Sequence, residues 1–147
     1  MKVAVCVISA IAAIAVLPGC GRVKVEGSYR DVENPAISYI FNADGTWRAE
    51  KVSEVGAGIF PHGSGRRLHG TFGRKGNIVE LKCVEVSREE PMSGEFRSEP
   101  VDVSAYDHRL RVEERALVPV AAKDGAESVF ASDINPLGAR RLVPPGE

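Results

Sequence analysis

The sequence has few of the features that identify enzymes, nucleic-acid-binding proteins and membrane-spanning proteins. Its 19 basic and 20 acidic residues give a formal net charge of −1, so no strongly basic surface for nucleic acid is expected. No P-loop, dinucleotide fingerprint, Ser-His-Asp arrangement or catalytic pair of carboxylates can be recognised. The sequence therefore predicts a non-enzyme that carries no cofactor or metal and binds no nucleic acid.

Long apolar runs are also missing, apart from one near the N-terminus. Residues 3–16 are apolar or small except for Ser9, and Lys2 places a positive charge before them. A run of about fourteen residues is too short for a comfortable transmembrane helix, which needs roughly twenty. Its length is typical of the apolar region of a secretory signal. We therefore expect residues 1–19 to form a signal-peptide helix that is removed.

The four residues Leu17-Pro18-Gly19-Cys20 resemble the lipobox of bacterial lipoproteins, in which a Leu stands three positions before a Cys and a small residue directly before it. Pro18 departs from the small residue that is usual two positions before the Cys. The resemblance implies cleavage before Cys20 and acylation of Cys20, and several acyl chains would anchor the protein permanently, at about 0.8 kcal/mol per buried methylene. Gly21, in place of Asp, implies an outer-membrane lipoprotein facing the periplasm. The alternative is an ordinary cleaved signal with an incidental Cys20.

Cysteine is scarce as well, because the chain contains only Cys6, Cys20 and Cys83. Removal of the signal and acylation of Cys20 would leave Cys83 as the one free thiol, so the mature chain could form no internal disulfide. Cys83 shares one face of a β-like run with Val79 and Leu81. A reactive thiol needs a positive, partly exposed setting, so we interpret Cys83 as a core residue.

Beyond residue 20 the sequence has no helical period over ten or more residues and is rich in short alternating runs. These runs recur about every ten residues and are separated by Gly, Pro, Asn and Asp, which is typical of an antiparallel all-β domain. About eight strands would suit a small meander barrel, closed or partly open, with an open two-sheet sandwich as the alternative. Strands are expected at 23–29, 37–41, 46–52, 68–72, 78–86, 96–105, 109–120, 128–131 and 137–143. The expected organisation is a signal over 1–19, a lipidated tether over 20–26, a barrel over 27–143 and a tail over 144–147.

Residues 39–47 predict the clearest hairpin, and Cys83 lies at a predicted irregularity. Tyr39 and Phe41 share a strand face, and Asp44-Gly45 supplies the turn. An EF-hand calcium site at Asp44 is not expected, because no Glu closes a ligand set. The inward parity of the 78–86 run changes between Cys83 and Val84, which predicts a β-bulge.

Several short segments resemble those of small lipocalin-like bacterial lipoproteins. They are Gly27-Ser28-Tyr29, Tyr39-Ile40-Phe41, Asp44-Gly45-Thr46-Trp47, Gly70-Thr71-Phe72 and Gly76-Asn77-Ile78-Val79-Glu80-Leu81. The resemblance covers about residues 27–81 and consists mostly of hairpin chemistry. It implies a meander barrel and the binding of an apolar ligand.

Aromatic residues are few, at 6% of the chain, and are the candidates for a ligand-lined interior. A buried side chain of this size stabilises a fold by roughly 1.5–3 kcal/mol, so core filling is the default and ligand lining the alternative. The residues concerned are Tyr29, Tyr39, Phe41, Trp47, Phe72 and Phe96.

The loop over 56–65 is the candidate contact region, with His62, Arg66 and Arg67 as its contact residues. Arg66 and Arg67 are expected in a loop, as are Arg74 and Lys75, and the four could form a basic lip that contacts anionic headgroups or peptidoglycan. The histidines at 62, 69 and 108 are interpreted as surface residues, with His108 in a turn. Zinc ligation would need a tighter spacing.

These observations lead to two hypotheses for a lipid-anchored envelope lipoprotein. The first is a non-catalytic binding module for a small apolar ligand. The alternative is a module that interacts with or inhibits an envelope protein through its loops, since some anchored barrels inhibit lysozyme in this way, or a structural envelope protein. Only Ser64-Gly65 and Ser93-Gly94 resemble the loops of such inhibitors.

Overall fold

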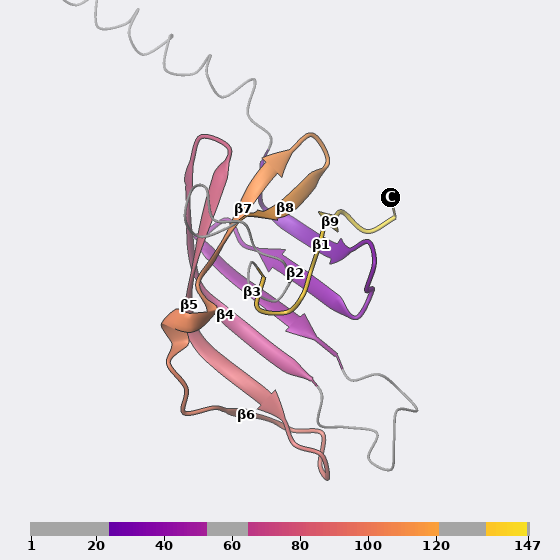
Figure 1. The fold of residues 1–147 in the computed structure, drawn as a ribbon, viewed down its shortest axis with the longest axis vertical. Coiled ribbons are helices and arrows are strands. Elements are labelled where there is room, and N and C mark those ends of the chain that lie inside the picture. The colour runs from indigo at the N-terminus through magenta and orange to yellow at the C-terminus, as the bar shows by residue number, and fades with distance from the viewer. Residues whose placement is uncertain (1–23, 53–64, 121–134, 147) are drawn as a thin grey trace, which may run out of the picture.

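The computed structural model describes residues 24–52, 65–120 and 135–146, and in these residues the fold is a single antiparallel sheet (Figure 1). One short 3-10 helix, η2, interrupts the strands. The elements are β1 (Gly27–Asp31), β2 (Ile37–Phe41), β3 (Thr46–Lys51), β4 (Arg66–Lys75), β5 (Ile78–Glu89), β6 (Phe96–Ser98), η2 (Val103–Tyr106), β7 (His108–Glu113), β8 (Ala116–Val120) and β9 (Leu142–Val143).

Eight of the strands close into a barrel. Neighbours in the sheet run β4-β3-β2-β1-β9-β8-β7-β5, and β4 also pairs with β5, which completes the ring. The order around the ring follows the chain, while β6 pairs only with the second half of β5 and lies outside the ring. The predicted all-β meander barrel is therefore confirmed, and it is closed instead of an open sandwich.

The short strand β9 completes the ring from the C-terminal side. Its Leu142 pairs with Asp31 of β1 on one side and with Leu117 of β8 on the other. The prediction of a strand over 137–143 is correct only for Leu142–Val143, because residues 135–141 form a turn that packs Leu137 and Ala139 into the core. The strand predicted over 128–131 lies outside the described residues.

One hydrophobic cluster fills the barrel. Strand side chains alternate between inside and outside, so Tyr39 and Trp47 are almost completely buried, whereas Ile40 and Arg48 beside them are exposed. The buried members are Val25, Tyr29, Ile37, Tyr39, Phe41, Trp47, Ala49, Leu68, Val79, Leu81, Cys83, Val86, Leu110, Val112, Leu117, Leu137, Ala139 and Leu142.

The hairpin between β2 and β3 has the predicted form. The Asp44 carboxylate accepts hydrogen bonds from the Thr46 amide at 3.0 Å and the Thr46 hydroxyl at 2.6 Å. These bonds lower the pKa of Asp44 below its ordinary value. Gly45 has φ of 87°, which favours glycine at this position of the turn.

The predicted bulge is also present, at Val84. The β4–β5 register passes from His69 opposite Glu85 to Gly70 opposite Cys83, so Val84 is the extra residue. A Cβ atom on Gly70 would lie 1.8 Å from the Lys82 carbonyl oxygen. The two backbones therefore approach this closely only because residue 70 is glycine.

Two side chains satisfy the backbone groups at this bulge. The Trp47 indole N–H is shared between the Thr71 carbonyl at 3.1 Å and the Lys82 carbonyl at 3.2 Å. The Cys83 amide donates to the Asp107 carboxylate at 2.7 Å. The Lys82 carbonyl and the Cys83 amide at the bulge therefore both have hydrogen-bond partners.

Five other strand predictions need correction. The first strand is β1 over 27–31, not 23–29. The strand expected over 96–105 is β6 followed by η2, because Pro100 cannot donate to a ladder and the Asp102 carboxylate accepts from the Ser104 amide as a helix cap. The single arm expected over 109–120 is the hairpin β7–β8, which turns at Glu114 and Arg115. The strand β4 runs over 66–75, not 68–72, and β5 extends to residue 89, not 86, so the charged residues expected in loops at 66–67 and 74–75 belong to strands.

Candidate functional site: a filled interior and an outer hollow

A polar cluster lies inside the barrel, where the prediction placed only apolar groups. The Tyr39 hydroxyl lies 2.8 Å from His108 Nε2, and His108 Nδ1 lies 2.8 Å from the Tyr106 carbonyl. A carbonyl can only accept, so Nδ1 carries the hydrogen and Nε2 accepts from Tyr39. The Asn135 amide nitrogen donates to the Tyr39 oxygen at 3.1 Å. His108 is thus a buried residue, 5% exposed, and its interpretation as a surface turn residue is wrong.

Burial decides the protonation of this cluster. It lowers the pKa of His108 to about 4 and raises the pKa of Tyr39. Both side chains are therefore neutral at neutral pH, and each of their polar atoms has a partner. A neutral, saturated and buried cluster holds elements together and is poorly suited to proton transfer with a substrate.

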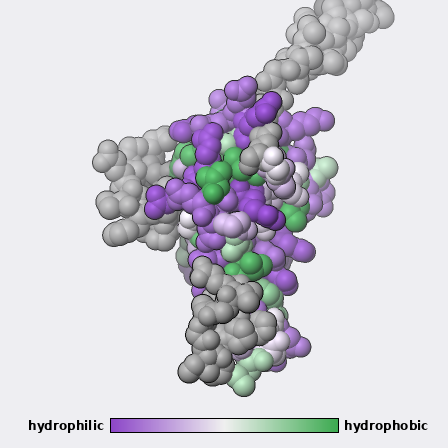
Figure 2. Space-filling model, turned by 90° about the vertical axis from the view of Figure 1, so that its right-hand side faces the viewer, coloured by the Kyte–Doolittle hydropathy of each residue, from purple (hydrophilic) through white to green (hydrophobic). Residues whose placement is uncertain are grey.

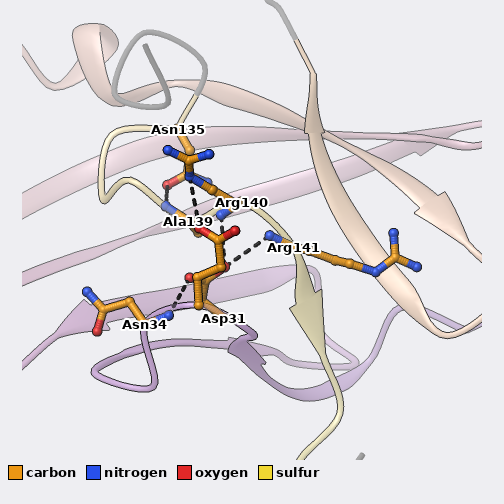
Figure 3. A network of polar contacts seen from close by, with 7 residues as sticks. Asp31, Asn34, Asn135, Ala139, Arg140 and Arg141 are labelled. Atoms are coloured by element: carbon orange, nitrogen blue, oxygen red, sulfur yellow. Dashed lines mark hydrogen bonds and ion pairs between the residues drawn. The ribbon is translucent and has the colours of Figure 1, made fainter.

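The same region holds the segment that closes the barrel (Figure 3). The Asn135 carbonyl oxygen accepts from the amides of Leu137 at 3.0 Å and Ala139 at 3.3 Å. The buried Asp31 carboxylate accepts from the amides of Arg140 at 2.8 Å and Arg141 at 3.0 Å.

Asp31 also fixes the turn that follows β1. Its second oxygen accepts from the Asn34 amide at 2.8 Å. A carboxylate with three backbone donors is strongly held in one place. Sequence reasoning missed Asp31, His108 and Asn135; only the Asp31-to-Asn34 spacing is a local signal, typical of a side chain that caps a turn.

Four of the six candidate aromatic residues fill the interior. Tyr39 stacks on Trp47 with ring centroids 6.0 Å apart and on Phe41 at 6.1 Å, while Tyr29 meets Phe41 edge-on at 5.7 Å. His108 lies edge-on to Trp47 at 5.4 Å. These four aromatic side chains therefore pack against one another inside the barrel.

The other two candidate aromatics lie at the margin of this core. Phe72 is half-buried and meets Phe41 edge-on at 5.2 Å. Phe96, in β6, lies outside the ring, and the Arg67 guanidinium carbon is 3.8 Å from the centroid of its ring.

The predicted contact residues have partners within the fold. Arg67 forms an ion pair with Glu50 at 2.9 Å, and Arg66 lies 4.0 Å from Glu99. Arg67 therefore links β4 to β3, and Arg66 lies beside the residue that follows β6; both belong to β4 and not to a loop. His62 and residues 56–64 of the proposed contact loop lie outside the described residues.

A single basic lip does not form on β4. Arg66 and Arg67 begin the strand, and Arg74 and Lys75 end it. At about 3.4 Å per residue the two pairs are roughly 25 Å apart or more. The expectation of one basic surface is therefore wrong.

Cys83 is a core residue, as predicted. It is 7% exposed and free. Burial raises the pKa of its thiol, and its sulfur donates to the Glu85 carbonyl at 3.4 Å. A thiol held in the protonated form is a poor nucleophile.

An open hollow of about 420 Å³ lies on the outside of β2, β3 and β4. The register aligns Ile40, Arg48, His69 and Glu85 across four neighbouring strands. The lining residues are Ile40, Asn42, Thr46, Trp47, Arg48, His69 and Gly70.

The chemistry of this outer hollow is both cationic and apolar. Arg48 is exposed, and no ion pair holds it within the described part of the chain. His69 lies 3.6 Å from Glu85. Ile40 is 42% exposed, and the bulge residue Val84, next to Glu85, is 58% exposed. Sequence alone does not reveal this group, because its members come from three strands and meet only through the register.

The face shown in Figure 2 is mostly hydrophilic, with small separate hydrophobic patches. Among the described residues, no group of three or more His, Cys, Asp and Glu side chains could hold a metal ion. The same residues include no helix long and apolar enough to cross a membrane. Comparison with protein-family models, curated proteins and solved structures found no match for this chain.

Proposed function

We propose that this protein is a lipid-anchored lipoprotein of the bacterial cell envelope, whose barrel is a non-catalytic module that binds a partner protein on its outer surface. The observation that supports a surface site is the occupied interior around Tyr39, Trp47 and His108. The anchor rests on the lipobox resemblance at residues 17–20, which lie outside the described residues. The outer membrane, facing the periplasm, is the proposed location.

The occupied interior favours a protein partner over an apolar cargo. Small-molecule sites usually have about 300–1,000 Å³ of space. Creating that space here would require moving Tyr39 or Trp47, which are buried and hydrogen-bonded. Removing a buried aromatic side chain typically costs about 3–5 kcal/mol. Binding at the outer surface requires no such rearrangement.

The outer hollow has the composition of a protein-binding surface. Arginine is among the residues that carry much of the energy at interfaces, and Arg48 lies here beside the exposed Ile40. A partner with an acidic side chain beside an apolar one would complement them.

Acylation is tested by mass spectrometry of the protein expressed from the full sequence in a Gram-negative bacterium. We expect the chain to begin at an acylated Cys20 and to partition into detergent. Cys20→Ser should abolish both properties. An unmodified mature N-terminus on the wild-type chain would contradict the anchor.

The outer hollow is tested by cross-linking in envelope preparations, followed by purification and identification of the cross-linked protein. We expect Arg48→Glu to reduce the yield of one specific cross-linked partner at least tenfold, because it reverses the charge of the hollow. Arg111→Glu is the matched control, since Arg111 is an exposed arginine on β7. Equal loss with both variants, or no loss with either, would contradict a site at the outer hollow.

A further inference from the structure

The described domain begins very close to the proposed anchor. Val25 is buried, and its carbonyl accepts a hydrogen bond from the Tyr29 hydroxyl at 2.9 Å. The chain is therefore part of the core from residue 25 onward. Four Cα–Cα steps separate Cys20 from Lys24, and they span at most about 14 Å. The barrel end that carries Lys24 must lie within that distance of an acylated Cys20.

Three turns share this end of the barrel, which we call the anchor-side end and define as residues 42–45, 75–77 and 113–115. Gly27 at the start of β1 pairs with Phe41, directly before the first turn. Lys24 and Glu26 line a second hollow of about 260 Å³ together with Glu114 and Arg115 of the third turn. Figure 1 shows the start of β1 at the same end as the β4–β5 and β7–β8 turns.

The β5–β6 hairpin lies at the opposite end (Figure 1). The strand β5 begins at Ile78, directly after the turn at 75–77, and runs for 12 residues, which is about 40 Å along its own axis. Even at a tilt of about 45°, β5 carries the hairpin more than 25 Å from the anchor-side end. Arg97 in β6 is therefore far beyond the reach of the tether.

The charges at the anchor-side end are balanced, so they would not draw this end toward anionic lipid. Positive and negative residues are equal in number among the residues that form it and flank it. They are Lys24, Arg74, Lys75 and Arg115 against Glu26, Asp44, Glu113 and Glu114. Surface potentials decay within about 10 Å at ordinary ionic strength, so the short covalent tether, and not attraction to anionic lipid, must set the orientation.

We infer that the anchor-side end faces the phospholipid headgroups and that the β5–β6 hairpin points away from the bilayer. This inference rests on the proposed acylation of Cys20. It adds a defined lipid-facing surface and places the outer hollow on the flank of the barrel directly beside that surface, because Asn42 belongs to both.

Fluorescence energy transfer in reconstituted vesicles tests the orientation. The acylated full chain, with Cys83→Ala to remove the buried thiol, would carry a donor dye on Lys75→Cys, Arg115→Cys or Arg97→Cys. The vesicles would be phosphatidylcholine with an acceptor on the headgroup. We expect efficient transfer from positions 75 and 115, at least threefold weaker transfer from position 97, and no change with salt or added phosphatidylglycerol. Transfer from position 97 equal to that from position 75 would overturn the inference.

Two controls separate this inference from the proposed anchor. Mass spectrometry before reconstitution shows whether Cys20 is acylated, so a missing anchor is seen independently of orientation. If Cys83→Ala fails to fold, the same three labelled variants can be made in a chain that retains Cys83, because its thiol is buried. Inserting twenty Gly and Ser residues after Gly21 should equalise transfer from the three positions, because a flexible linker of that length spans about 25 Å. Unchanged contrast with the long linker would also overturn the inference.

Discussion

At the scale of single residues, Gly70 sets how closely β4 and β5 approach. The Lys82 carbonyl occupies the place where a side chain at residue 70 would begin. The contact is with backbone, which cannot rotate away as a flexible side chain would. The bulge at Val84, the indole bond of Trp47 and the outer hollow all depend on this approach.

Replacing Gly70 with Ala should therefore destabilise the barrel. We expect a loss of about 3 kcal/mol in the free energy of unfolding, measured by urea denaturation. Gly73→Ala is the matched control on the same strand, because nothing lies within 4 Å of the Cβ position at Gly73. A decrease of less than 1 kcal/mol in the free energy of unfolding of Gly70→Ala would show that β4 and β5 can move apart without destabilising the barrel.

His108 makes the stability depend on pH. Its folded pKa of about 4 lies below the ordinary value of 6.5, so the unfolded chain takes up the proton first as pH falls. The stabilisation is complete above about pH 6.5 and is lost progressively as pH falls to 4, by about 3 kcal/mol in total. Thermal unfolding across this range should show the decrease.

Two histidine variants separate this effect from general acid denaturation. His108→Gln should flatten the dependence on pH between 6.5 and 4, whatever its stability at neutral pH. His69→Gln should retain the dependence, because His69 is half-exposed on the outer surface. A steep decrease that persists in His108→Gln would assign the acid sensitivity to another group.

At the scale of elements, Asp31 decides whether β9 stays in the ring. The strand β9 has two residues and few ladder bonds of its own. The bonds from Arg140 and Arg141 to Asp31 hold the segment before it. Polar side chains thus supply part of the closure that a longer strand would supply by pairing.

Asp31→Ala should open this closure locally. Three backbone donors would lose their acceptor, with an expected loss of roughly 3 kcal/mol. Hydrogen exchange at the amides of Arg140 and Arg141 should accelerate more than exchange in the β2–β3 hairpin. Asp102→Ala is the comparison, because Asp102 caps only the exposed η2. Uniform acceleration over the whole barrel would mean that Asp31 supports global folding and not closure.

Sequence could predict the elements that are specified by residues close together in the chain. Asp44 and Gly45 provide the turn chemistry of β2–β3, and the change of parity at Val84 indicated the bulge. The turn over 135–141 that precedes β9 could not be predicted, because Asp31 and Arg140 are more than one hundred positions apart. The Asp107-His108 pair looks like a polar turn, and only the distant Tyr39 makes His108 a core residue.

The candidate site was less predictable for the same reason. The aromatic core followed from strand alternation, so the core interpretation of Tyr39 and Trp47 was correct. The outer hollow requires Arg48, His69 and Ile40 to lie side by side, and that depends on the exact register of three strands. Arg66 and Arg67 were assigned to a contact loop because nearby glycines suggested one, whereas β4 begins at Arg66.

At the scale of the whole molecule, the barrel is a packed scaffold with two unlike ends and, as proposed, a binding surface on its flank. The anchor-side end would meet the bilayer, and the β5–β6 hairpin would extend away from it. The flank carries Arg48 with exposed apolar residues. This arrangement suits a protein that presents a surface to an envelope partner and carries no cargo inside.

Native mass spectrometry of the domain secreted with Cys20→Ser tests this central claim most directly. We expect one species with the mass of the polypeptide alone, even after incubation with fatty acids and phospholipid, because side chains fill the interior. Tyr39→Ala would create space beside Trp47 and serves as the positive control for an interior that can accept a ligand. An apolar molecule bound one-to-one to the chain with Tyr39 intact would contradict the account.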